Sequence, residues 1–374
     1  MAEFLYIHIP YCVRKCIYCD FLSLPFDEQG ARRYVAGLCR ELEIKRDAAG
    51  ILRTVFIGGG TPTLLPDDCF EQLFHCLHEN FEFSPAIEIS VEANPGTVQA
   101  AKVEDLLTLG VNRMSVGTQS FHDDELKTLG RIHTADEAIG AVQLLKNAGL
   151  RNFSVDLMYG IPGQSIETWE ETLSKAIWLS PSHISAYELT PEEGTPLSLL
   201  IKENAIEMPS EGLVLDMYDH VIDFLQGSGF EHYEISNFAL PGFRCLHNLN
   251  YWDRGEYIGA GAGAHSFIEG VRSRNTRDIR TYIDSLSNNI IPETETIAVT
   301  NDEALKEFVF LGLRKTGGIA LAQAKKKRPD FMEACAELVS SGHLEISGNN
   351  LRLTRKGLPL SNMVIVHLFE RLGL

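Results

Sequence analysis

The sequence feature that most constrains the fold is a series of six short runs rich in Val, Ile, Phe and Tyr. A helical stretch follows each run. The runs lie near residues 3–9, 54–58, 86–92, 112–117, 152–158 and 182–188. Successive strand–helix units of this kind predict a parallel sheet with helices outside. Six units are too few for a closed eightfold barrel, so we expect an α/β fold with a partial, open (β/α)6 barrel. Ligands in such sheets bind at the carboxyl ends of the strands.

The pattern changes past residue 235. Residues 237–300 are rich in Gly, Asn and Arg and predict loops. From 301, helices at 302–314 and 330–341, a hairpin at 344–353 and a final helix predict a small winged-helix-like α+β domain. Residues 301–374 carry a net charge of +3 and the first 300 carry −21, which also favours a boundary there. We therefore expect three parts, 1–236, 237–300 and 301–374.

The net charge of −18 makes the chain a poor generic binder of nucleic acid, and we predict no such partner. The basic run 325–328 is typical of a solvated face. No apolar run reaches about 18 residues, which predicts no membrane span. The first residues lack the basic and apolar segments of a signal peptide. We expect a cytoplasmic protein whose eight cysteines are thiols.

The strongest chemical signal is the group Cys12, Cys16 and Cys19, just after the first predicted strand. Soft thiolates suit an iron–sulfur cluster or zinc. A structural zinc site needs four ligands, and no second cysteine pair follows here. A [4Fe–4S] cluster normally takes four cysteines, so three leave one iron open to another ligand. An incidental group of thiols or a zinc loop is the alternative.

This Cys-x3-Cys-x2-Cys segment resembles the signature of radical SAM proteins, and Tyr18 matches the aromatic residue usual before the third cysteine. The resemblance covers about residues 1–235 and continues to the C-terminus. It implies that the three cysteines hold a [4Fe–4S] cluster whose open iron binds the amino and carboxylate groups of S-adenosylmethionine. In that family an electron from the cluster then cleaves the sulfonium to a 5′-deoxyadenosyl radical.

The resemblance also implies a set of contacts with S-adenosylmethionine. The Gly-rich turn at residues 58–62 resembles the loop that meets the amino group, and Glu92 resembles the residue that meets the ribose hydroxyls. Each position has a structural alternative, such as a turn cap for Asp156 or a surface charge for Arg131. Whether a second S-adenosylmethionine binds is left open. The expected contacts are Tyr6, Tyr18, Gly59, Gly60, Thr61, Glu92, Gln119, Arg131 and Asp156.

Within the superfamily, residues 6–12 and 117–121 resemble the branch of oxygen-independent coproporphyrinogen III oxidase. The oxidases carry a further cysteine two residues beyond the third, where this chain has Phe21. They also carry an N-terminal extension, whereas eleven residues precede Cys12 here. Both differences point away from the oxidase itself.

Residues 247–252 fit the His-Asn-x-x-Tyr-Trp motif of HemW-type heme chaperones. The resemblance implies heme binding by His247, Asn248, Tyr251 and Trp252, and arginine suits the heme propionates. We expect a heme chaperone with heme as cargo and an acceptor protein as partner. Transient membrane docking and a homodimer are further expectations. The alternative is radical decarboxylation of coproporphyrinogen III, so whether the chain is an enzyme stays open. Six arginines lie near the motif: Arg244, Arg254, Arg272, Arg274, Arg277 and Arg280.

Overall fold

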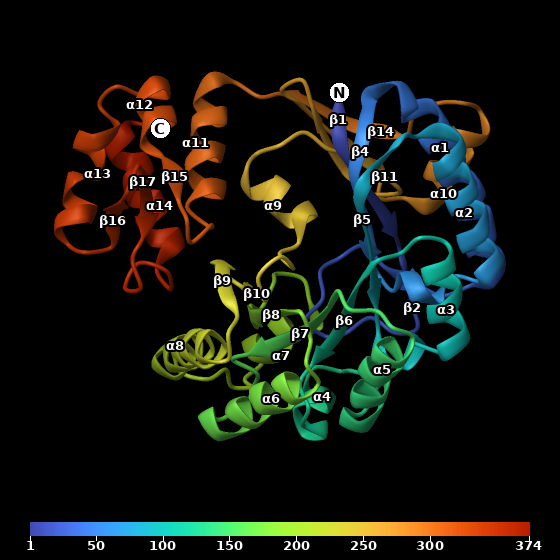
Figure 1. Ribbon diagram of the computed structural model, residues 1–374, viewed down its shortest axis with the longest axis horizontal. Coiled ribbons are helices and arrows are strands. Elements are labelled where there is room, and N and C mark those ends of the chain that lie inside the picture. The colour runs from blue at the N-terminus through green and yellow to red at the C-terminus, as the bar shows by residue number, and fades with distance from the viewer.

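The computed structural model describes residues 1–374 and places all six predicted strands in one sheet (Figure 1). Their order in the sheet follows the chain, and every neighbouring pair is parallel. The first and last of the six do not pair, so the predicted open (β/α)6 barrel is confirmed. The strands are β1 (Ala2–Ile9), β4 (Ala49–Gly59), β5 (Phe83–Ala93), β6 (Arg113–Gln119), β7 (Phe153–Tyr159) and β8 (His183–Glu188).

Helices cover the outer face of this sheet (Figure 1). Two of them begin with capping boxes, at Thr134 and Ser165, which satisfy free backbone N–H groups of the first turn. Short 3-10 turns lie at Arg46–Ala48, Pro62–Leu64 and Pro95–Thr97. The helices are α1 (Glu28–Lys45), α2 (Asp67–Asn80), α3 (Ala100–Thr108), α4 (Asp123–Thr128), α5 (Ala135–Asn147), α6 (Ile166–Trp178), α7 (Pro196–Lys202) and α8 (Glu211–Gly227).

Strand β1 shows how the sheet separates its two faces. Leu5, Ile7 and Ile9 are fully buried in the main hydrophobic core. Side chains alternate along a strand, so Tyr6 and His8 point to the opposite face, the interior of the barrel. Polar side chains therefore line the inside of the barrel, and aliphatic ones join it to its helices.

Residues 237–300 do not form the predicted loops, and that prediction was wrong. Strand β11 extends the main sheet parallel to β1, and β9 and β10 extend its other edge. Each element spans only three to nine residues, too few to show a clear period. Strand β11 also contains Gly259, a residue type that is uncommon in strands. Glycine is needed there because a Cβ would lie 1.9 Å from the backbone oxygen of His265. Strand β9 (Glu231–Glu234) lies just before this stretch. The elements within the stretch are β10 (Asn237–Ala239), α9 (Leu246–Trp252), β11 (Ile258–Ala260), β12 (His265–Ile268), β13 (Val271–Asn275), α10 (Ile279–Ser287) and β14 (Glu293–Ala298).

The C-terminal module has the predicted winged-helix-like arrangement, with three-stranded sheet order β15-β17-β16. The expected hairpin is confirmed, and Gly348 adopts the positive φ of +59° at its turn. Figure 1 places the module beside the barrel, with α11 facing α9. Its elements are α11 (Asn301–Gly312), β15 (Ile319–Ala320), α12 (Leu321–Lys327), α13 (Phe331–Ser340), β16 (Leu344–Ser347), β17 (Asn350–Leu353) and α14 (Ser361–Leu372).

Ion pairs join this module to the middle of the chain. Glu307 on α11 lies 2.6 Å from both Arg254 and Arg272, and Lys315 pairs with Asp253. The domain boundaries at 236 and 300 stay predictions. None of the helices has the length and apolar character needed to cross a bilayer.

Candidate cofactor and ligand site

The three cysteines lie beyond the carboxyl end of β1: Cys12 ends the short strand β2 (Tyr11–Cys12), and Cys16 and Cys19 lie on the loop between β2 and β3 (Leu24–Pro25). They are half-buried, whereas the other five cysteines of the chain are buried. Backbone bonds fix the loop: the Ile17 N–H donates to Leu129 O at 3.3 Å, and its carbonyl accepts from Leu197 N–H at 2.9 Å. Arg14 donates to Gly130 O at 2.7 Å. The three thiols are thus the accessible ones, on an anchored loop.

The donor set of this loop fits a [4Fe–4S] cluster. Burial raises the pKa of the Cys12 and Cys19 thiols, and a hydrogen bond from Thr61 acts in the opposite direction on Cys12. Arg131 Nη1 lies 3.5 Å from Cys16 Sγ, so a cation faces the site of thiolate charge. No three metal-ligating side chains converge on one point. A cubane does not require that, because each of its cysteines binds a different iron.

The glycine-rich turn approaches the cysteine segment closely. Gly60 N–H donates to Ile9 O at 2.8 Å, and Thr61 N–H donates to Tyr11 O at 2.7 Å. A Cβ on Gly60 would lie 2.5 Å from that Tyr11 oxygen. Gly59 has φ +112°, and its Cβ would lie 2.4 Å from the His8 ring. Only glycine fits at both positions.

Two acidic residues lie on neighbouring parts of the barrel wall, Glu92 next to the last residue of β5 and Asp156 in the middle of β7. Glu92 accepts the Gly59 N–H at 2.9 Å. Burial, with a smaller contribution from the charge of Asp156, raises the pKa of Glu92 to about 7. Asp156 accepts hydrogen bonds from Ser115 at 2.6 Å and Ser154 at 2.9 Å. The carboxyl of Glu92 therefore titrates near neutrality beside the glycine turn.

The remaining expected contacts surround the same end of the barrel. Gln119 has a positive φ of 69° at the end of β6, which is rare for a residue other than glycine. Arg131 donates a hydrogen bond to the carbonyl of Gly117. Burial raises the pKa of Tyr18, and the positive charge of Arg131 partly offsets this rise. The Tyr6 hydroxyl lies 2.9 Å from His8 Nδ1. The fold thus brings all nine expected residues to one end of the barrel, and their binding of S-adenosylmethionine stays a prediction.

His247 lies enclosed inside the barrel. Its Nδ1 is 2.6 Å from Thr54 Oγ1, and its Nε2 is 3.0 Å from the Tyr251 hydroxyl. The ring stacks on Phe56 with centroids 5.2 Å apart. Burial, followed by the charge of Arg113, lowers the pKa of His247 to about 3, so the imidazole is neutral. Both ring nitrogens are therefore engaged within the chain.

Glu88 on β5 holds the helix that carries His247. Its carboxylate accepts the N–H groups of Leu246 and His247, each at 3.2 Å, at the start of α9. A carboxylate there satisfies free donors and interacts favourably with the helix dipole. Sequence analysis missed this residue, although the alternation Glu88, Ser90, Glu92 along a strand signals a polar barrel interior.

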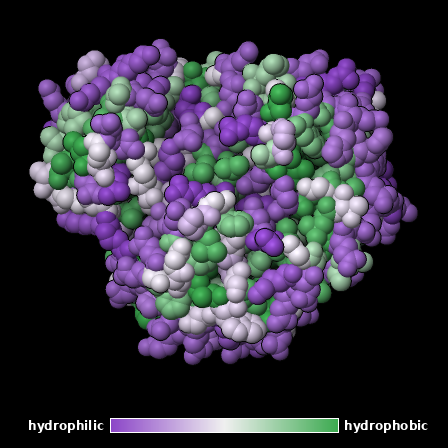
Figure 2. All heavy atoms as spheres, viewed as in Figure 1, coloured by the Kyte–Doolittle hydropathy of each residue, from purple (hydrophilic) through white to green (hydrophobic).

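The His-Asn-x-x-Tyr-Trp motif lies on helix α9, not on a loop, and its members face different surroundings. Tyr251 packs edge-on against Tyr257 with centroids 4.7 Å apart and lines a cavity. Trp252 faces the C-terminal module, with the Arg314 guanidinium 5.6 Å from its ring. Asn248 is half-buried. On the face in Figure 2, apolar atoms appear at the position of α9 within a mostly hydrophilic surface.

The cavity at Tyr251 has a volume of about 350 Å³ and adjoins the cysteine loop. Asp20, Phe21 and Leu22, which follow Cys19 directly, form one wall. Tyr6, His8 and Tyr251 form a second wall on the side of the barrel interior. Tyr257, Gly263, Ala264, His265 and Arg277 complete it. The segment that follows the three cysteines and one residue of the predicted heme motif thus line the same cavity.

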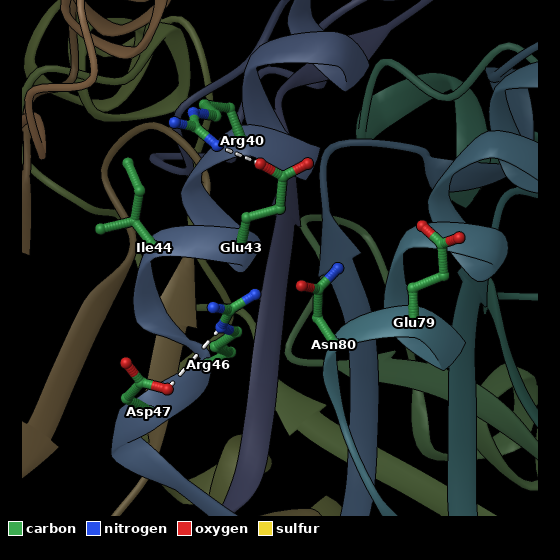
Figure 3. Close-up of a pocket in the computed structure, with 7 residues that line it drawn as sticks. All are labelled: Arg40, Glu43, Ile44, Arg46, Asp47, Glu79 and Asn80. Atoms are coloured by element: carbon green, nitrogen blue, oxygen red, sulfur yellow. Dashed lines mark hydrogen bonds and ion pairs between the residues drawn. The ribbon is translucent and has the colours of Figure 1, made fainter.

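A second depression, of about 710 Å³, lies far from these residues, near the amino ends of β4 and β5 (Figure 3). Six of its seven lining residues are polar. Arg40 pairs with Glu43, and Arg46 lies 3.7 Å from Asp47 (Figure 3). Parallel αβ sheets bind ligands at the opposite end of the strands, so we assign no role to this depression.

Comparisons with known proteins agree with the geometry. Residues 6–176 match the radical SAM superfamily, and residues 299–360 match the HemN C-terminal domain. The heme chaperone HemW of Bacillus subtilis (strain 168) is 35% identical over 96% of this chain and 97% of its own length. HemW of Escherichia coli (strain K12) is 41% identical over 75% of both chains.

Among solved structures, coproporphyrinogen III oxidase (HemN) from Escherichia coli, a radical SAM enzyme, superposes with a TM-score of 0.84. The match covers 98% of this chain and 90% of HemN, at 22% identity. At that identity the likeness establishes the fold alone.

Proposed function

This chain belongs to the HemW family of heme chaperones within the radical SAM superfamily, and we propose that it binds heme and passes it to an acceptor protein. The observation that carries the proposal is the end-to-end similarity to HemW proteins, at 35% identity over 96% of the chain. The position of Tyr251 supports it, because this motif residue lines a cavity that adjoins the cysteine loop.

The proposal assigns a [4Fe–4S] cluster to Cys12, Cys16 and Cys19 and S-adenosylmethionine to the surrounding barrel end. When bound, the cluster supplies an open iron corner for chelation and one-electron chemistry. The Thr61 hydroxyl lies 3.7 Å from Cys12 Sγ and Arg131 Nη1 lies 3.5 Å from Cys16 Sγ, so a donor and a cation face the sulfurs that would hold the cluster. Glu92 presents an acceptor for ribose hydroxyls beside the glycine turn.

The motif residues are proposed to build the heme site in different ways. Tyr251 offers a ring to the cavity, and His247 fixes the orientation of Tyr251 through the 3.0 Å contact with its hydroxyl. Direct ligation of iron by His247 requires α9 to leave the barrel, which breaks both bonds to Glu88. Trp252 holds the helix against the C-terminal module through its contact with Arg314.

Phe21 distinguishes the chaperone from the oxidase alternative. The position that resembles the further cysteine of the oxidases holds a phenylalanine that is 63% exposed and lines the cavity. An exposed aromatic ring at a cavity mouth suits contact with a flat apolar ligand.

Titration of the anaerobically prepared full-length chain with hemin tests the proposal. We expect a saturable Soret shift with one heme per chain, weakened in Tyr251→Ala and in His247→Gln. Incubation with coproporphyrinogen III, S-adenosylmethionine and a reductant should yield no vinyl product. Nonsaturable hemin binding, or vinyl product, contradicts the proposal.

Three expectations about partners have no test in the structure and stay predictions. These are the homodimer, transient docking at a membrane and the absence of a nucleic-acid partner. Light scattering of the cluster-loaded protein, with and without heme, tests the first. Flotation with anionic vesicles and a salt-dependent mobility shift test the other two.

A further inference from the structure

One arginine near α9 differs from the others in lacking a partner. Of the six arginines around the motif, five form ion pairs with Glu or Asp: Arg244, Arg254, Arg272, Arg274 and Arg280. Arg277 forms no ion pair and no hydrogen bond within the chain, although it is exposed and lines the 350 Å³ cavity. Its charge is therefore available to an anion that enters the cavity.

A histidine of the same cavity is also free. His265 opens β12 opposite Arg274, is exposed, and makes no side-chain hydrogen bond. The other two histidines of this region are engaged, since His8 contacts Tyr6 and Leu22 O and His247 contacts Thr54 and Tyr251. His265 alone among them offers a ring nitrogen to a metal ion in the cavity.

We propose that His265 ligates the iron of a heme whose edge enters this cavity, and that Arg277 pairs with a heme carboxylate. The inference rests on the proposed function and names the residues of its ligand site. Imidazole is a common axial ligand of heme iron, and a guanidinium forms paired, charge-assisted bonds with carboxylates. Iron, carboxylate and apolar ring thus each meet a matching group, because Tyr251, Tyr257 and Phe21 supply aromatic surface.

The walls of the site are held in place from outside it. Glu307 forms an ion pair with Arg272, and Arg272 in turn faces the Tyr257 hydroxyl. Burial raises the pKa of Tyr257, and the charge of Arg272 acts in the opposite direction. The absence of a side chain at Gly263 lets Leu22 pack closely against it, since a Cβ at this position would lie 3.1 Å from the Leu22 side chain. These contacts fix the wall without occupying His265 or Arg277.

The size of the cavity agrees with a carrier. About 350 Å³ lies at the lower end of the range for small-molecule sites, so a tetrapyrrole enters by one edge and leaves the rest in solvent. An acceptor protein then reaches the exposed part of the heme before the chaperone releases it. The wall formed by residues 20–22 also places the heme beside the cluster loop.

Binding of three porphyrins to the full-length, cluster-loaded protein tests the His265 and Arg277 contacts separately. Hemin has iron and free carboxylates, protoporphyrin IX lacks iron, and hemin dimethyl ester lacks free carboxylates. We expect His265→Ala to weaken the binding of hemin about tenfold or more and to move its Soret maximum, while the affinity for protoporphyrin IX stays unchanged. We expect Arg277→Ala to weaken the binding of hemin and of protoporphyrin IX about tenfold, and to change the binding of hemin dimethyl ester little. Imidazole should restore the spectrum of His265→Gly.

His75→Ala and Arg46→Ala are matched controls, because both residues lie on the surface near α2 and the end of α1, away from the cavity. Neither control should change binding. An unchanged Soret maximum and affinity in His265→Ala would overturn the inference while leaving the proposed function intact. A Soret shift in His247→Gln alone would do the same. If the wild type shows no saturable hemin binding, the proposed function itself fails.

Discussion

Replacing Glu88 should release α9 from the barrel. Glu88 is 7% exposed, and its carboxylate accepts two backbone N–H groups, from Leu246 and His247, at 3.2 Å each. A hydrogen bond to a charged group contributes roughly 1.5–3 kcal/mol, and a buried donor without a partner costs a similar amount. Water entry recovers part of the loss, so we estimate about 3 kcal/mol for Glu88→Ala. That corresponds to about a 100-fold larger opening constant for α9.

Native-state hydrogen exchange with mass spectrometry measures this opening. In Glu88→Ala, peptides that cover residues 246–252 should exchange about 100-fold faster, and peptides from β6 should change little. Glu88→Gln keeps an acceptor oxygen and should give an intermediate, roughly tenfold effect. Glu82→Ala is the matched control, since this exposed carboxylate precedes the same strand. Wild-type protection of residues 246–252 in Glu88→Ala would refute the assignment of Glu88 as the cap of α9.

Three further predictions concern the barrel end. Glu92 has a pKa raised from 4.5 to about 7 in the fold, so wild-type stability falls as pH rises from about 4.5 to 7. Urea unfolding should therefore show Glu92→Gln more stabilising at pH 8 than at pH 5 by roughly 2–3 kcal/mol, and equal effects at both pH values would contradict this. Gly60→Ala should reduce bound S-adenosylmethionine in equilibrium dialysis at least tenfold, because its Cβ would collide with Tyr11 O; normal binding would show that the turn adapts. Cys16→Ala should abolish the iron and sulfide content after anaerobic reconstitution and buried Cys335→Ala should preserve it, and the reverse result would exclude the loop as the cluster site.

Much of the framework was predictable from local patterns. Each of the six long strands buries aliphatic residues on one face, and this burial appears in the sequence as apolar runs between helices. The hairpin at Gly348 and the cysteine loop are likewise encoded within a few residues. The family resemblance followed from such short motifs, and the comparisons confirmed it.

The short elements between 237 and 300 were not predictable in this way. Strand β11 has only three residues, one of them the glycine Gly259, and its position depends on the edge that β1 leaves open. The motif helix α9 is likewise too short to be stable by itself, and it depends on Glu88, which lies 158 positions before Leu246 in the chain.

The sequence alone was enough to predict the type of sheet, the grouping of three cysteines on one loop and the family, because regular burial and close spacing of residues are local properties. Only the tertiary structure decided which histidine is enclosed and which is free. His247 belongs to the recognised motif, yet Thr54 and Tyr251 occupy both of its nitrogens. His265 and Arg277 belong to no motif and stand unpaired at the cavity. The availability of a side chain depends on partners from distant segments, and local sequence does not record them.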